Sequence, residues 1–183
     1  MLNGDIDKVL ITEAEIRFKV CELGQAISKE YENKDLILIS VLRGGFIFVA
    51  DLIRTLSIPV TIDFMAISSY GPSTDTSGVV QVIKDLEENI AGKDVLIVED
   101  IIDTGLTLNY LIKSLKARGP ASLQICTLLD KSARRIVYTL PIKYKGFDVP
   151  DVFVVGYGLD YRQQYRNLPY VGILRKSVYE LDT

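Results

Sequence analysis

Short segments that are largely apolar constrain the fold of this chain more than any other feature. Residues 36–40 read LILIS, residues 95–98 read VLIV, and residues 123–129 read LQICTLL. A strand without a polar face must be buried on both sides, as happens in a parallel sheet that helices cover. The second segment runs directly into acidic residues, within the stretch VLIVEDIIDTGLTL at 95–108. Charges that follow a buried strand so closely are expected to serve a ligand.

Segments with helical spacing alternate with these strands. Thr12 and Glu15 fit a capping box, and apolar residues then recur at helical spacing as far as residue 27. Residues 46–56 follow a glycine turn and are long and periodic enough for a helix, and residues 108–115 show the same pattern before a Gly-Pro stop. The alternation indicates an α/β protein whose ligands bind beyond the carboxyl ends of parallel strands.

The remaining segments complete a single predicted domain, residues 1–183. Residues 60–67 and 79–83 are strand-like. Between them, residues 68–78 read SSYGPSTDTSG, a composition typical of a mobile loop. No internal linker or repeat interrupts the sequence, so one compact unit is expected.

The composition limits the classes of function. With 21 basic and 24 acidic residues among 183, a broad surface for nucleic acid or an anionic membrane is not favoured. Cys21 and Cys126 match neither a metal nor a redox spacing, so we expect reduced and buried thiols. The start MLNGDIDKVL lacks the pattern of a secretory signal, and no segment approaches the ~20 apolar residues of a membrane span. We therefore expect a cytoplasmic protein without a membrane partner.

The absence of histidine restricts the chemistry further. Within one chain it excludes a Ser-His-Asp triad, a Cys-His pair and histidine-ligated zinc. Any metal must be held by oxygen. That favours Mg²⁺, which prefers one or two carboxylates together with substrate phosphates.

The stretch after the apolar strand resembles an anion site. Thr104, Gly105 and Thr107 stand where a helix is expected to begin, so backbone N–H groups, hydroxyls and the helix dipole could bind a phosphate monoester. Asp103 would repel that anion unless it faces another part of the ligand. We therefore infer a substrate group that gives up a proton, or hydroxyls that need acceptors.

An acid at a helix start is more often a simple N-cap than a functional group, and Asp103 alone would be interpreted in that way. The adjacent Glu99 and Asp100 change this balance. Two neighbouring carboxylates are costly to desolvate unless they meet cations or hydrogen-bond donors, such as Mg²⁺ or ribose hydroxyls.

An apolar strand, Glu-Asp, two apolar residues and Asp-Thr-Gly-x-Thr together resemble the 5-phosphoribosyl 1-pyrophosphate (PRPP) signature of type I phosphoribosyltransferases. VLRGGFIFVADL, DFMAISSYG, LLDKSARR and FVVGYGLDYRQQYRNLPYVG also occur in the order and spacing seen in the bacterial hypoxanthine-guanine phosphoribosyltransferases. The resemblance spans about residues 11–179. It implies the type I phosphoribosyltransferase fold, a mostly parallel sheet flanked by helices, with a small hood and a mobile active-site loop.

The resemblance implies one group of residues that holds PRPP and metal. Glu99 and Asp100 would meet the ribose hydroxyls and Mg²⁺, and Asp160 would ligate a second Mg²⁺. The 5′-phosphate would be held by six consecutive residues: Asp103, Thr104, Gly105, Leu106, Thr107 and Leu108. Pyrophosphate and the closing lid would involve five more: Arg43, Gly44, Arg166, Ser69 and Tyr70. The peptide before Arg43 is expected to be cis.

A second group would hold the purine. Lys131 would contact O6, Phe153 would stack on the ring, and the backbone of Val154 would bond its edge. Asp103 would accept the purine proton as the catalytic base. Ser132 stands where many bacterial relatives have proline, so Lys131 is expected to be held less rigidly.

The function implied is Mg²⁺-dependent transfer of the 5-phosphoribosyl group from PRPP to hypoxanthine, guanine or both, giving IMP or GMP and pyrophosphate. A homo-dimer or homo-tetramer is expected. One alternative is an RNA-binding regulator with the same fold, which the net charge of −3 disfavours. Another is an enzyme that prefers xanthine or uracil. Without the resemblance, Asp160 could simply pair with Arg162 or Arg166.

Overall fold

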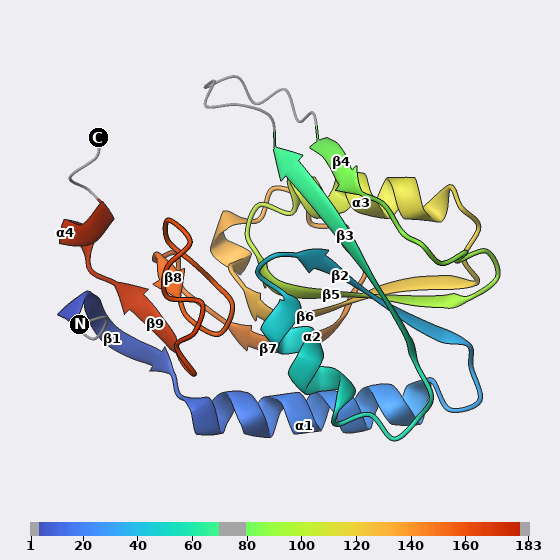
Figure 1. The fold of residues 1–183 in the computed structure, drawn as a ribbon, viewed down its shortest axis with the longest axis horizontal. Coiled ribbons are helices and arrows are strands. Elements are labelled where there is room, and N and C mark those ends of the chain that lie inside the picture. The colour runs from blue at the N-terminus through green and yellow to red at the C-terminus, as the bar shows by residue number, and fades with distance from the viewer. Residues whose placement is uncertain (1–3, 70–79, 180–183) are drawn as a thin grey trace.

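A six-stranded, mostly parallel sheet forms the centre of the molecule (Figure 1). The computed structural model describes residues 4–69 and 80–179. Neighbouring strands are parallel except for β4, which runs antiparallel to β3 at one edge. In spatial order the strands are β4 (Val80–Lys84), β3 (Thr61–Ser69), β2 (Leu36–Leu42), β5 (Asp94–Ile102), β6 (Ser122–Asp130) and β7 (Ile142–Asp148).

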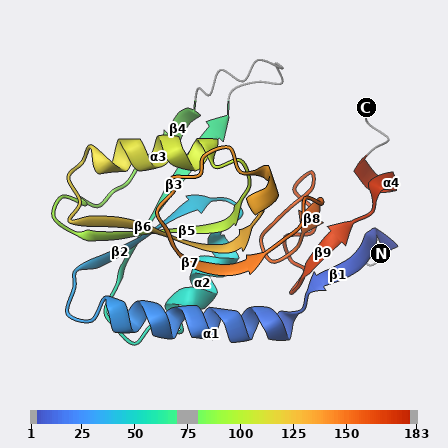
Figure 2. The same ribbon diagram turned by 180° about the vertical axis from the view of Figure 1, so that it is seen from behind.

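Helices cover both faces of this sheet, as the apolar strands predicted. Helices α1 (Glu13–Glu30) and α2 (Phe46–Ile53) lie on one face, and α3 (Leu106–Lys116) lies on the other (Figures 1 and 2). Alternate side chains of β2 and β5 enter two separate apolar cores, one shared with α1 and α2 and the other shared with α3. The sheet is therefore buried on both sides, which explains the apolar runs at residues 36–39 and 95–98.

The predicted capping box fixes the start of α1. The Thr12 hydroxyl accepts a hydrogen bond from the N–H of Glu15 at 3.3 Å, and the Glu15 carboxylate accepts one from the N–H of Thr12 at 2.8 Å. The chain thus satisfies backbone donors that would otherwise lack partners. None of the described helices is long and apolar enough to cross a bilayer.

A second, three-stranded sheet forms the hood. It consists of β1 (Ile6–Ile11), β9 (Val171–Leu174) and β8 (Val154–Val155), all paired antiparallel. The hood lies beside one end of the large sheet, and the short helix α4 (Lys176–Tyr179) follows β9 there (Figures 1 and 2). The hood brings the two ends of the described chain to the same side of the molecule.

Several sequence predictions require correction. The apolar run at residues 95–98 marks only part of strand β5, which continues to Ile102 because it stays paired with β6 as far as Asp130. Helix α2 ends at Ile53, three residues earlier than expected. Cys126 is buried as predicted, whereas Cys21 on α1 is exposed. Most of the mobile loop predicted at residues 68–78 falls in the range 70–79, which lies outside the described residues.

Candidate active site

Two adjacent carboxylates on β5 form the centre of the candidate site. Glu99 and Asp100 are partly buried near the carboxyl end of the large sheet. Burial raises the pKa of Asp100 from 3.8 to about 6, although the nearby charge of Arg166 opposes the shift. Burial, together with the charge of Asp100, also raises the pKa of Glu99 well above its usual range. The pair is therefore costly to ionise without a cation or hydrogen-bond donors.

Three chain segments meet closely at Asp100. A Cβ atom on Gly44, in the turn after β2, would overlap the carboxylate oxygen Oδ2 of Asp100. A Cβ atom on Gly158, in the loop after β8, would overlap the carbonyl oxygen of Gly44. Glycine is needed at both positions because only a bare backbone fits. The peptide between Leu42 and Arg43 is cis, as the sequence predicted.

Two arginines approach these carboxylates and share a partner. Arg43 donates a hydrogen bond to Oε1 of Gln163 at 2.9 Å, and Arg166 donates one to the same oxygen at 3.1 Å. Arg166 also pairs with Asp160 at 2.8 Å and donates to the carbonyl oxygen of Gly158 at 2.7 Å. The structure thus brings the two predicted pyrophosphate ligands together, and Gln163 is a site residue that sequence reasoning missed.

The predicted phosphate loop lines a cavity of about 200 Å³. Asp103, Thr104, Gly105 and Thr107 contribute to its wall, beside Glu99. Gly105 precedes α3 with φ of 81°, a left-handed conformation that suits glycine. The Thr104 hydroxyl accepts a hydrogen bond from the N–H of the next-but-one residue at 3.4 Å. The cavity therefore lies at the N-terminus of α3, the end of a helix that attracts anions.

The two leucines of this loop differ in their placement. Leu106 is 45% exposed, whereas Leu108 is buried in the core under α3 and also lines the cavity. Any contact of Leu106 with a phosphate would thus come from its backbone N–H, because its side chain is apolar.

The predicted base ligands line a different cavity of about 900 Å³. Lys131 follows β6 and is only 7% exposed, and no described residue forms a hydrogen bond or ion pair with its ammonium group. Phe153 is 37% exposed and lines the same cavity, directly before Val154 of β8. An amine and an aromatic ring thus face one space, as recognition of a flat heterocycle requires.

Asp103 lies at the junction of the two cavities. Its Oδ2 atom accepts a hydrogen bond from Arg134 at 3.4 Å, and Arg134 lines the cavity of Lys131. Its Oδ1 atom is buried and has no hydrogen-bond partner among the described residues. Arg134 also pairs with Asp151 at 3.5 Å, so one guanidinium links Asp103 to the segment before the hood.

Glu99 and Asp100 supply carboxylate oxygens, the ligand type that Mg²⁺ prefers. Among the described residues, no three acidic or sulfur ligands gather closely enough to enclose a metal, so Asp160 does not join Glu99 and Asp100 in one cage. Mg²⁺ commonly binds one or two carboxylates and takes its other ligands from phosphates and water. Asp160 is instead paired with Arg166, which was the structural alternative left open by the sequence.

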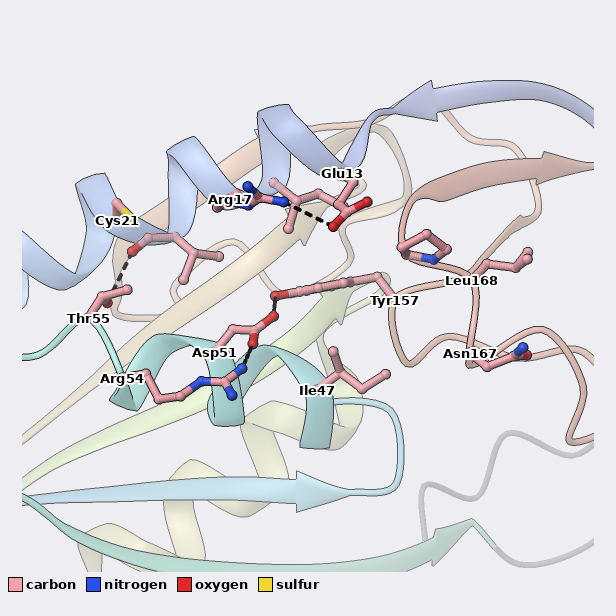
Figure 3. A pocket seen from close by; sticks show the side chains of 13 residues that line it. Glu13, Arg17, Cys21, Ile47, Asp51, Arg54, Thr55, Tyr157, Asn167 and Leu168 are labelled. Atoms are coloured by element: carbon pink, nitrogen blue, oxygen red, sulfur yellow. Dashed lines mark hydrogen bonds and ion pairs between the residues drawn. The ribbon is translucent and has the colours of Figure 1, made fainter.

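Another cavity lies away from these groups. It has a volume of about 450 Å³ and lies between α1, α2 and the loop after β8 (Figure 3). Tyr157 donates a hydrogen bond to Asp51 at 2.6 Å in its wall, and Arg17 pairs with Glu13 at its edge. It contains none of the residues predicted to bind PRPP, metal or base.

The comparison with known families agrees with this geometry. Residues 10–162 match the model of the phosphoribosyl transferase domain. The chain belongs to the phosphoribosyl transferase family.

Relatives of this phosphoribosyl transferase share about half of its sequence. The hypoxanthine-guanine phosphoribosyltransferase of Bacillus subtilis is 51% identical over 180 residues, covering 98% of this chain and 99% of that protein. The hypoxanthine phosphoribosyltransferase of Escherichia coli is 52% identical over 167 residues, covering 90% and 93%. A crystal structure of a hypoxanthine phosphoribosyltransferase from Staphylococcus aureus superposes with a TM-score of 0.93 at 47% identity, covering 97% and 96%.

Replacing Gly44 with alanine should abolish most activity. The new methyl group would collide with Asp100, so either the carboxylate or the pyrophosphate turn must move. We expect kcat/KM to fall by at least ~10²-fold, because small misplacements at a reacting centre have effects of this size. Gly4→Ala is the control, since nothing lies within 4 Å of the added atom there. Near-normal kcat/KM in Gly44→Ala would contradict the close approach.

Mg²⁺ should stabilise the protein more at pH 8 than at pH 5. Folding raises the pKa of Asp100 from 3.8 to about 6. Within this pH window the native state therefore holds more protons than the unfolded state, and the free energy of unfolding falls as the pH rises through it. Above the window the ionised carboxylate of Asp100 attracts Mg²⁺, whereas at pH 5 protons compete. Thermal unfolding with and without Mg²⁺ measures this, with Asp100→Asn as the variant that should lose the response. Equal Mg²⁺ shifts at both pH values would exclude the pair as the binding site.

Proposed function

We propose that this chain transfers the 5-phosphoribosyl group of PRPP to hypoxanthine or guanine, releasing pyrophosphate and forming IMP or GMP. The observation that carries the proposal is the largely buried side chain of Lys131 beside the ring of Phe153, because no described residue forms a hydrogen bond or ion pair with the Lys131 ammonium group. An amine without a partner in a confined site requires an acceptor from a ligand. The 6-oxo group of hypoxanthine or guanine is such an acceptor, and the names of the relatives support this choice.

At the PRPP end of the site, the positively charged groups and the acidic groups would have different roles. The start of α3 would hold the 5′-phosphate, and Arg43 and Arg166 would neutralise the leaving pyrophosphate. Glu99 and Asp100 would accept hydrogen bonds from the ribose hydroxyls and favour a sugar that becomes cationic at the transition state. Mg²⁺ bound by the carboxylates would neutralise charge on the phosphate oxygens. Asp160 would contribute to a second metal contact if Arg166 turned toward pyrophosphate.

The base end accounts for the acid within the anion site. Asp103 lines the phosphate cavity, yet it is linked through Arg134 to the cavity of Lys131. It would accept the proton that the purine nitrogen loses as the bond to C1 forms. Lys131 would donate to O6, whereas adenine would present an amino donor there and leave two donors opposed. Val154 would bond the edge of the ring through its backbone.

The remaining properties are proposed from the resemblance. We expect one domain over residues 1–183, in the cytoplasm, assembled as a homo-dimer or homo-tetramer. Ser69 ends β3 and would contribute to a lid that closes over PRPP, while Tyr70 lies outside the described residues. Light scattering on the purified protein measures the assembly directly.

Pyrophosphate release with a panel of bases tests the proposal. With PRPP and Mg²⁺, kcat/KM should be highest with hypoxanthine or guanine and far lower with adenine. A higher kcat/KM with xanthine or uracil would mean that the protein is a phosphoribosyltransferase for that base instead. Absence of release with every base, together with RNA binding that weakens as salt increases, would instead support the regulatory alternative.

Asp103→Asn should keep the shape of the loop while removing the proton acceptor. General-base contributions are typically ~10²–10⁴-fold, so kcat with hypoxanthine should fall within that range while PRPP affinity changes little. Steady-state kinetics and PRPP binding by calorimetry separate the two effects. Normal turnover at neutral pH would show that another group takes the proton.

Lys131→Ala should weaken binding of 6-oxopurines. A hydrogen bond from a charged donor contributes about 1.5–3 kcal/mol, so the KM for hypoxanthine should rise on the order of 10- to 100-fold. The ratio of kcat/KM for hypoxanthine to kcat/KM for adenine should fall, and the KM for PRPP should stay unchanged. Lys113→Ala, on the exposed side of α3, is the matched control. Unchanged hypoxanthine kinetics would move the O6 contact to another residue.

A further inference from the structure

The ring of Phe153 is contacted by the C-terminal turn of the described chain. Tyr179, the last residue of α4, stacks on it with ring centroids 5.2 Å apart and ring planes 28° apart. Tyr161 meets the same ring edge-on, with centroids 5.6 Å apart and planes at 88°. Both arrangements are favoured between aromatic rings and contribute beyond the burial of surface. Phe153 is therefore fixed in orientation by two tyrosines.

The backbone of Phe153 is held by the same part of the chain. Its carbonyl oxygen accepts a hydrogen bond from the N–H of Leu174, at the end of β9, at 2.9 Å. Tyr179, five residues after Leu174, stacks on the side chain of Phe153. The last strand and the turn that follows it thus hold both the backbone and the ring of one residue.

Tyr179 is itself positioned by the hood. The N–H of Arg175 donates to the carbonyl oxygen of Asp5 at 2.9 Å, and the N–H of Val178 donates to the carbonyl oxygen of Arg175 at 3.0 Å, which closes the turn. Val178 and Tyr179 pack against the apolar core of the hood. The tyrosine ring is therefore placed by a hydrogen-bonded turn with apolar support.

Burial alone would not fix Phe153. Its ring is 37% exposed and lines the cavity that also contains Lys131 and Tyr179. An aromatic side chain with this much free surface can rotate unless neighbouring groups oppose it. The stacked ring of Tyr179 restricts this rotation.

We propose that Tyr179 is a positioning residue for the purine, because it holds the ring of Phe153 in the orientation that presents its remaining surface to the base. The inference rests on the proposed function, in which Phe153 stacks on the purine. Tyr179 acts through Phe153 and does not take part in PRPP binding. Helix α4 is therefore part of the base site.

Kinetics of Tyr179→Ala, beside Tyr179→Phe and Tyr138→Ala, test this role. Tyr179→Ala should raise the KM for hypoxanthine and the Kd for IMP roughly three- to tenfold, the range expected for one aromatic pair. The KM for PRPP and kcat should stay within about twofold. Tyr179→Phe keeps the ring and should restore normal values. Tyr138 is 82% exposed, so Tyr138→Ala controls for loss of a surface tyrosine.

Other outcomes would overturn the inference. A fall in the KM for hypoxanthine would mean that Tyr179 occupies space needed by the base. Equal rises in KM for both substrates, with a lower Tm, would mean general loosening of the hood, and unchanged values would exclude any role. If the unmodified protein transfers phosphoribose to hypoxanthine, these failures concern Tyr179 alone. If it does not, the proposed function fails and the inference fails with it.

Discussion

The repulsion between Glu99 and Asp100 is the constraint on which the candidate site depends. Burial raises the pKa of both carboxyl groups, so ionising them costs more free energy in the folded chain than in water. Among the described residues, Asp100 is approached by the bare backbone of Gly44, by the N–H of Ile101, which donates a hydrogen bond to it at 2.8 Å, and by the charges of Arg166 and Asp160. Such a pair destabilises the free protein and favours whatever supplies cations or hydroxyl donors.

The surrounding charges are arranged to complement one substrate. Under the proposed function, Arg43 and Arg166 would meet the leaving pyrophosphate, the N-terminus of helix α3 would meet the 5′-phosphate, and the two acids would lie between them. Gln163 accepts a hydrogen bond from Arg43 and another from Arg166. Among the described residues, neither arginine forms an ion pair with Glu99 or Asp100.

The buried strands and their helices could be predicted because their patterns are local. The apolar runs of β2 and β5, the capping box at Thr12 and the spacing in α3 all reflect neighbours within a few residues. The hood could not be predicted in this way. Strand β8 has only two residues, β9 has only four, and β1 has a mixed burial pattern without clean alternation.

The candidate site shows the same division. Glu99, Asp100 and the loop after them stood out because charge follows an apolar strand. Gln163 and Tyr179 did not, since their importance arises from partners 120 and 26 residues away, Arg43 and Phe153. Positions of this kind carry no local signal, and only the folded chain brings them to the site.

The most direct test of this account is the free energy of unfolding of Glu99→Gln, measured with urea at pH 8 without Mg²⁺, beside its turnover. Removing one charge of the buried pair should increase stability, while transfer to hypoxanthine with PRPP and Mg²⁺ should fall sharply. Glu32→Gln, at an exposed position, should change neither. A less stable Glu99→Gln protein, or one with normal turnover, would contradict the claim that the chain retains this repulsion for function.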